Sequence, residues 1–147
     1  MKLRVERWYP WVAALLGSLA WHYFSFPFPC DEKEFLAAAI SLGAIMTGFI
    51  ATAQAILASL PGDSAMGRIR KSGYIDDLMI YLKESLYGCL GFSVYSLIGF
   101  FFLSPKIVLP RFYGEIFVGI TIFSMLAFQR VSSVLFKILH FQPPRED

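Results

Sequence analysis

Long apolar runs separated by short polar stretches organise this chain. Four runs, at about 8–28, 35–60, 86–103 and 116–136, hold 86 residues and one of the 24 charged side chains, Arg130. A helix needs about 20 apolar residues to cross the ~30 Å hydrocarbon core of a bilayer, whereas a surface helix of a soluble protein carries a charged face. The pattern therefore predicts an all-α integral membrane protein, a bundle of four transmembrane helices formed by these runs.

The pieces between the runs are short. They contain 7, 6, 25, 12 and 11 residues, and a segment below about 40 residues rarely folds alone without a metal or disulfides. We therefore expect residues 1–147 to form a single transmembrane domain, with one substantial loop at 61–85.

The first run has a second interpretation, a cleaved signal peptide. Lys2, Arg4 and Arg7 give it a basic start, and Ser18-Leu19-Ala20 resembles a cleavage site. However, the apolar run continues to Phe28, beyond the 7–15 residues of a typical signal core. We favour a transmembrane helix.

Lysine and arginine are distributed unevenly between the two sides of the membrane. The termini, the second loop and the fourth span carry ten of them, and the first and third loops carry three. Basic residues mark the cytoplasmic side. This predicts a multi-pass protein of the bacterial inner (cytoplasmic) membrane with both termini in the cytoplasm.

The loop at 61–85 combines a basic cluster with an amphipathic segment. Pro61-Gly62-Asp63 is a turn signal, and apolar residues from Ile75 to Leu86 recur at helical spacing. An amphipathic cytoplasmic helix is expected from about Gly73, running along the membrane surface or straight into the third span. The residues expected to contact lipid headgroups or a cytoplasmic partner are Arg68, Arg70, Lys71, Tyr74, Asp76 and Asp77. Of the two, lipid contact is favoured.

Small residues repeat every four positions along the second run. They are Gly43, Thr47, Ala51, Ala55 and Ser59, with the polar Gln54 beside them and a parallel row of Ala44, Gly48 and Thr52. Such rows let helix backbones approach closely in lipid. They indicate either tight packing within one bundle, which we favour, or a polar pore lining assembled between copies.

Arg130 lies 15 residues into the fourth span. A charge at the bilayer centre costs at least about 2.5 kcal/mol, so the side chain needs a partner or a route to water. It either extends to lipid phosphate, which is favoured, or pairs with Asp76, Asp77 or Glu84.

Composition narrows the function classes. Apolar residues make up 56% of the chain, charged residues 16%, and the net charge of +2 is too small for a nucleic-acid binder. No phosphate-binding loop, HExxH or CxxC motif occurs. His22, Cys30, Asp31 and Glu32 match no usual zinc spacing. We expect no metal, no cofactor and no enzyme activity.

The layout carries a family resemblance. The long second span ending at Leu60-Pro61 and the segment from Arg68 to Tyr74 leading into the third span resemble the RexB family of phage-exclusion membrane proteins. The layout is more loosely similar to KwaA, the four-span membrane subunit of the Kiwa defence system. The overlap runs from about Ala44 to Ser93. This chain departs from the pattern of these families in its acidic pair, Asp76-Asp77, and in its Phe-rich third span.

The resemblance implies an inner-membrane component of an antiphage system. Such a protein would form a homo-oligomer that conducts ions, as RexB-like members do, or signals to a cytoplasmic defence subunit, as Kiwa-like members do. The alternative is a non-catalytic scaffold or accessory subunit of an unrelated membrane complex. The partners expected are the lipid bilayer, further copies of the chain and a cytoplasmic defence protein.

Overall fold

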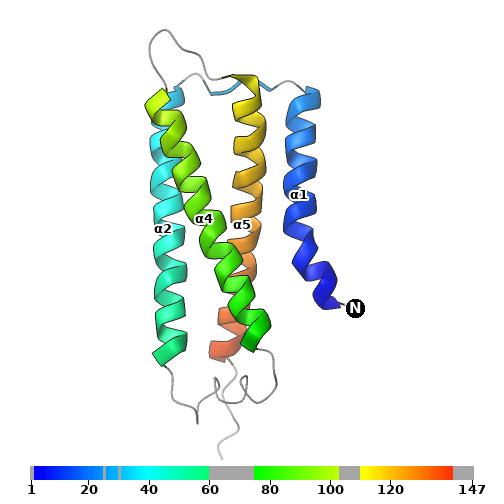
Figure 1. Cartoon of the computed structure of the whole chain (residues 1–147), viewed down its shortest axis with the longest axis vertical. Coiled ribbons are helices and arrows are strands. Elements are labelled where there is room, and N and C mark those ends of the chain that lie inside the picture. Colours follow the sequence, from blue (N-terminus) through cyan, green and yellow to red (C-terminus); the bar gives the residue numbers. More distant parts are fainter. Residues whose placement is uncertain (1, 25, 30, 60–74, 103–109, 141–147) are drawn as a thin grey trace, which may run out of the picture.

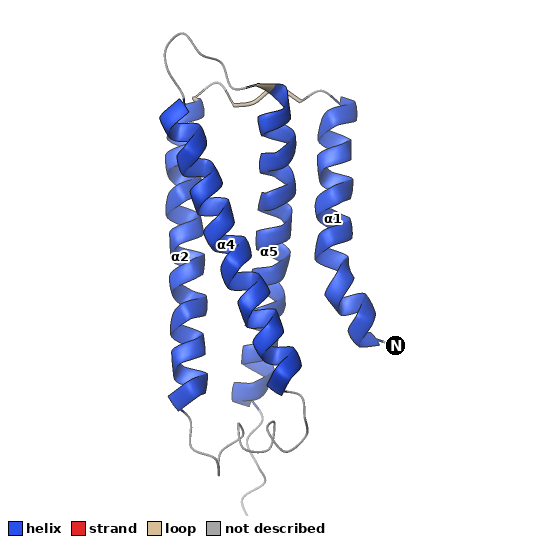
Figure 2. Cartoon of the chain, viewed as in Figure 1, coloured by secondary structure: helices blue, strands red, loops and turns tan. Residues whose placement is uncertain are grey.

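Helices make up nearly all of the described structure. The computed structural model describes residues 2–24, 26–29, 31–59, 75–102 and 110–140. Its helices are α1 (Lys2–Phe24), α2 (Glu32–Ser59), α4 (Ile75–Phe102) and α5 (Arg111–His140). Within these ranges no residue is in a strand (Figure 2). The all-α prediction is confirmed.

Successive helices alternate in direction (Figure 1). Lys2, Ser59, Ile75 and His140 therefore lie at one end of the bundle, here called the terminal end. The other end, called the opposite end, holds Phe24, Glu32, Phe102 and Arg111. The helices pack side by side in the order α2, α4, α5, α1, so α1 stands at the edge and contacts mainly α5.

Three of the helices, α2, α4 and α5, are long and apolar enough to cross a membrane. In α1 the helix ends at Phe24 rather than at Phe28. Pro27 and Pro29 account for this, because proline offers no N–H to a helix and restricts the residue before it. The apolar part of α1, residues 8–24, rises only about 25 Å at 1.5 Å per residue.

The amphipathic segment of the second loop belongs to a long helix. α4 begins at Ile75 and continues without a break to Phe102, so the segment runs straight into the third span. Within 61–85 the structure describes residues 75–85, which are all helical, and their buried face includes Leu78 and Leu82. Glu84, which the charge pattern placed outside the membrane, lies within the apolar helix that runs from Leu78 to Phe102.

Buried residues alternate at spacings of three and four. On α2 they are Leu36, Ala39, Gly43, Met46, Ile50 and Leu57. On α4 the buried set includes Leu78, Leu82, Ser85, Cys89, Phe92 and Ser96, and on α5 it includes Phe117, Ser124, Ala127, Val131 and Leu135. This spacing is typical of helices that pack nearly antiparallel with interlocking side chains.

Small residues permit the closest helix approaches. A Cβ added at Gly43 of α2 would lie 2.9 Å from Ser93 Cβ of α4, and one at Gly119 of α5 would meet Ser18 Oγ of α1. The Ser18 hydroxyl donates to the Glu115 carbonyl at 2.9 Å, and the Tyr9 hydroxyl donates to the Leu126 carbonyl at 3.1 Å. These contacts hold α1 against α5 along its length.

Candidate functional site

A buried ion pair joins α4 to α5 near the terminal end. Arg130 Nη2 lies 2.9 Å from Glu84 Oε2, and the guanidinium carbon lies 4.1 Å from the centroid of the Tyr81 ring. The Arg130 side chain is 7% exposed and that of Glu84 is 21% exposed. Because the two helices are antiparallel, residues near the start of α4 meet residues near the end of α5.

This geometry decides between the two alternatives for Arg130. The side chain does not extend to the surface; it turns inward to a carboxylate and an aromatic face. Of the three acidic residues considered as partners, Glu84 is paired with Arg130, and the side chains of Asp76 and Asp77 lie outside the described structure. A guanidinium suits this position, because it bonds a carboxylate and stacks on a ring with the same planar group. An intramembrane ionisable pair of this kind is a functional-site candidate by default.

Small polar side chains continue from the ion pair along the contact between α4 and α5. Ser85, Cys89 and Ser124 are all buried. The Ser124 hydroxyl donates to the Gly88 carbonyl at 2.8 Å, and the Cys89 thiol donates to the Ser124 carbonyl at 3.9 Å. Among the described residues, the Ser85 hydroxyl interacts only weakly, with the side chain of Cys89. We call Glu84, Ser85, Cys89, Ser124 and Arg130 the polar seam.

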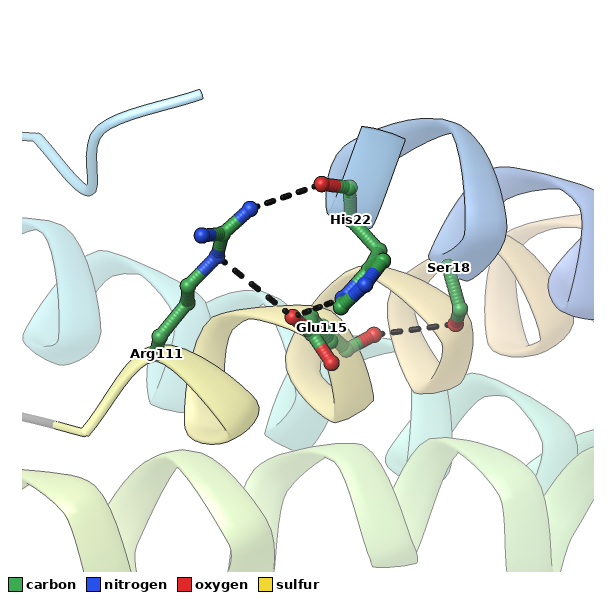
Figure 3. Close-up of polar contacts among 4 residues, drawn as sticks. All are labelled: Ser18, His22, Arg111 and Glu115. Carbon is green, nitrogen blue, oxygen red and sulfur yellow. Dashed lines mark hydrogen bonds and ion pairs between the residues drawn. The ribbon is translucent and has the colours of Figure 1, made fainter. Parts of the chain in front are cut away.

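A second polar cluster lies at the opposite end, between α1 and α5 (Figure 3). His22 Nδ1 lies 2.7 Å from Glu115 Oε1, and Arg111 Nε lies 3.7 Å from the same oxygen. Arg111 Nη2 donates to the His22 carbonyl at 2.7 Å. The His22 and Arg111 side chains are largely exposed. This cluster fastens the end of α1 to the start of α5.

Sequence reasoning missed the second cluster. Arg111 and Glu115 are four residues apart, a spacing at which helical side chains meet. This spacing could have predicted the Arg111–Glu115 pair from the sequence. His22 is 93 residues from Glu115 in the chain, so its part in the cluster requires the packing of α1 on α5. Among the described residues, no group of three His, Cys, Asp or Glu side chains could hold a metal ion.

The predicted small-residue row of α2 does not lie on one side of the helix. Each step of four residues turns the row by about 40° at 3.6 residues per turn. Gly43 is buried against α4, Thr47 and Gln54 are half-buried, and Ala51, Ala55 and Ser59 are exposed. The Thr47 hydroxyl donates to its own helix, to the Gly43 carbonyl at 2.7 Å.

The predicted contact residues of the second loop fall largely outside the described structure. Arg68, Arg70, Lys71 and Tyr74 lie outside the described residues. Asp76 and Asp77 form part of the first turn of α4, where the helix dipole favours carboxylates, and their side chains are not described.

Comparison with known proteins adds no relative. No protein-family model, no curated protein and no solved structure matches this chain.

Proposed function

We propose that this protein is a non-catalytic component of a bacterial antiphage system in the inner membrane. In this proposal it forms a homo-oligomer that conducts ions or signals to a cytoplasmic defence subunit. The resemblance of residues 44–93 to RexB-like and Kiwa-like proteins supports the defence role. Three helices able to cross a membrane support the location.

The proposal includes α1 as a fourth span, with both termini in the cytoplasm. α1 lies antiparallel to α2 and packs along α5. Trp8 and Trp11 are exposed near one end of it and Tyr23 near the other, as expected for aromatic residues at the two membrane surfaces. The excess of Lys and Arg on the side of the termini supports the orientation.

A labelling experiment tests this orientation. A cysteine at Ser64, in a background where Cys30 and Cys89 are serine, is expected to stay unlabelled by a membrane-impermeant maleimide in intact cells. It should react once the cells are permeabilised. Labelling of intact cells would contradict the cytoplasmic placement of the second loop.

The observation that supports self-assembly is the outward surface of α2. One sector of that surface has large side chains: Leu42, Ile45, Phe49 and Ile56. The neighbouring sector has only small ones, all exposed: Ala37, Ser41, Ala44, Gly48, Ala51, Thr52, Ala55 and Ser59. We call the second set the small sector. It spans about 33 Å at 1.5 Å per residue, the thickness of the hydrocarbon core.

The other helices lack such a surface in their described parts. The exposed residues of α1, α4 and α5 include many large apolar side chains, among them Leu15, Leu19, Leu90, Val94 and Phe136. Inside this chain small residues mark close helix contacts, as at Gly17, Gly43 and Gly119. Gly48, by contrast, has no atom within 4 Å of an added Cβ. A small sector without a neighbour fits a contact with another copy, because close backbone approach is what drives helix association in lipid.

Enlarging the small sector tests both assembly and conduction. Ala51→Leu is expected to convert the oligomer to monomer in native mass spectrometry from mild detergent. It should also abolish the loss of membrane potential that a RexB-like channel causes when expressed, because the larger side chain blocks close approach or fills the lumen. The matched control is Ala38→Leu, since Ala38 is exposed on the sector of large residues. It should leave both readouts unchanged.

The same experiment separates the channel from the scaffold. A wild-type oligomer that leaves potential-sensitive dyes unchanged would favour a scaffold or accessory subunit. A wild-type protein that is monomeric would contradict both the channel and the scaffold.

A further inference from the structure

We propose that copies of this chain assemble head to tail, with α1 of one copy packed against the small sector of α2 in the next. This inference rests on the self-assembly in the proposed function, and it names the second surface of that contact. The partner of the small sector is therefore a second copy of this chain, which presents a different helix.

α1 and α2 form the two edges of the chain (Figure 1). α1 contacts mainly α5, and α2 contacts mainly α4. On α2 the side that faces away from the other helices includes the small sector. On α1, Gly17 and Ser18 pack on α5, and the other side carries four large side chains, each at least 50% exposed: Trp8, Val12, Leu15 and Leu19. We call these four residues the α1 stripe.

The α1 stripe and the small sector share one spacing. Positions 8, 12, 15 and 19 of α1 are separated by steps of four, three and four, and so are positions 37, 41, 44 and 48 of α2. Steps of three and four keep a row on one side of a helix, as in helices that pack with interlocking side chains. The two rows can therefore form one continuous contact.

The two rows also lie at the same depths. α1 ends at Phe24 and α2 begins at Glu32, both at the opposite end of the bundle. Leu19 and Ala37 each lie five residues from that end, about 8 Å at 1.5 Å per residue. A rotation about the membrane normal, which relates the copies of a ring, leaves these depths unchanged. Between copies each large residue thus meets a small one: Leu19 with Ala37, Leu15 with Ser41, Val12 with Ala44 and Trp8 with Gly48.

The small sector can accept apolar side chains at these depths. The Ser41 hydroxyl donates to the Ala37 carbonyl of its own helix at 3.0 Å, so it keeps its partner when an apolar side chain covers it. Gly48 has no atom within 4 Å of an added Cβ. Large side chains of α1 would fill the space that the small residues leave, and such close packing stabilises helix contacts in lipid.

Charged groups match at the opposite end. Residues 31–34 carry three acidic side chains and one lysine, and Glu34 is exposed two residues from the start of α2. His22 lies two residues from the end of α1. In its cluster with Arg111 and Glu115 the exposed groups are the basic ones, at 66% and 59%, while Glu115 is 24% exposed. An acidic start of α2 would therefore meet a basic end of α1 at the same depth.

α1 is the helix that gains most from a second neighbour. Its apolar part, residues 8–24, rises about 25 Å, less than the ~30 Å hydrocarbon core. It is not among the three helices of the described chain that are long and apolar enough to cross a membrane. Oligomerisation is one way in which a short span is accommodated in a bilayer. A neighbouring α2 would cover the α1 stripe with protein.

The contact determines the form of the assembly. It joins two different surfaces, so each added copy exposes a new surface of each kind until a ring closes. A contact between two small sectors would instead join identical surfaces and end at a dimer.

Cysteine cross-linking tests the pairing. In a background where Cys30 and Cys89 are serine, Leu19→Cys and Ala37→Cys are placed in two differently tagged chains that are expressed together. Oxidation of the membranes with copper phenanthroline should join the two tags in one disulfide-linked dimer, because a disulfide requires Cα atoms within about 7 Å. With both substitutions in one chain, the product should be a ladder of covalent oligomers.

Ala38→Cys provides the matched control. Ala38 is exposed next to Ala37, on the sector of large residues. Paired with Leu19→Cys, it should give no product that carries both tags. Ala37→Cys expressed alone should give no covalent dimer either, since the small sectors do not meet one another in a head-to-tail ring.

An exchange of side-chain size tests the register. Ala37→Leu should convert most of the oligomer to monomer in native mass spectrometry. Adding Leu19→Ala to the same chain should restore the oligomer, because each chain gives α1 to one neighbour and α2 to the other. Leu19→Ala should not restore the oligomer of Ala51→Leu, since Ala51 lies about 21 Å further along α2 than Ala37.

The possible failures are distinguishable. A covalent dimer of Ala37→Cys alone, or an oligomer that forms no disulfide between Leu19→Cys and Ala37→Cys, would overturn the head-to-tail contact and leave the proposed homo-oligomer intact. An Ala37→Leu variant that Leu19→Ala does not restore would also overturn it. A wild-type protein that is monomeric would overturn the proposed self-assembly as well.

Discussion

Replacing Glu84 with alanine is expected to lower the free energy of unfolding by up to about 3–5 kcal/mol, because it removes a carboxylate that pairs with the buried guanidinium of Arg130. The Nη2–Oε2 distance is 2.9 Å and the Arg130 side chain is 7% exposed, so the pair is largely shielded from water. The measurement is reversible unfolding in mild detergent, followed by helix content.

The neighbouring residue provides the control. Lys83 carries a charge on the exposed side of α4, where its ammonium lies 6.0 Å from the Tyr87 ring. Lys83→Ala should change stability by less than about 0.5 kcal/mol. Equal effects of the two substitutions would show that the buried pair has no special role.

Arg130→Lys distinguishes the observed pairing from simple extension to the surface. Lysine extends to lipid phosphate as readily as arginine, but its ammonium has no planar group that could stack on Tyr81 while bonding Glu84. We therefore expect a loss of stability for Arg130→Lys as well, smaller than that for Glu84→Ala. Full stability with lysine would favour surface extension.

Gly43→Ala is expected to lower the free energy of unfolding by about 1–3 kcal/mol, the usual cost of an overpacked core. The added Cβ would lie 2.9 Å from Ser93 Cβ and 3.1 Å from Ser93 Cα. The second of these atoms is backbone, which cannot rotate away, so α2 and α4 must move apart. The Ser93 hydroxyl, which donates to the Ile40 carbonyl at 3.2 Å, should lose this bond in the variant.

Gly91→Ala is the matched control for this substitution. Gly91 lies in α4, the helix against which Gly43 packs. A Cβ added at Gly91 meets nothing within 4 Å. Alanine is a better helix former than glycine by roughly 1 kcal/mol, so Gly91→Ala should be neutral or stabilising. A similar loss at both positions would mean that glycine acts through helix flexibility rather than through close approach.

The positions of the helices follow from the sequence. Long runs free of charge mark α2 and the apolar parts of α4 and α5, because no water in the bilayer core can bind an exposed backbone and only a helix satisfies every N–H and C=O within the segment. Prolines 27 and 29 shorten α1 at a place that the run of apolar residues alone did not reveal. The sequence allowed the amphipathic segment either to run along the membrane surface or to continue into the third span. The structure shows the second, because α4 runs without a break through Glu84.

The partners of the polar residues were decided by the tertiary structure. Arg130 and Glu84 are 46 residues apart, and His22 and Glu115 are 93 apart. The hydropathy of each segment is the same whichever helix lies beside it, so it says nothing about such pairs. The order α2, α4, α5, α1 brings them together.

The surface of α2 also depends partly on the sequence and partly on helix packing. The sequence alone determines that small residues are concentrated on this helix. Which of them are covered depends on where α4 packs: its contact follows positions spaced by three and four, buries Gly43 and leaves Ala51, Ala55 and Ser59 outside. The physical reason is that a row spaced by four turns about 40° at every step, while a packing contact stays on one side of the helix.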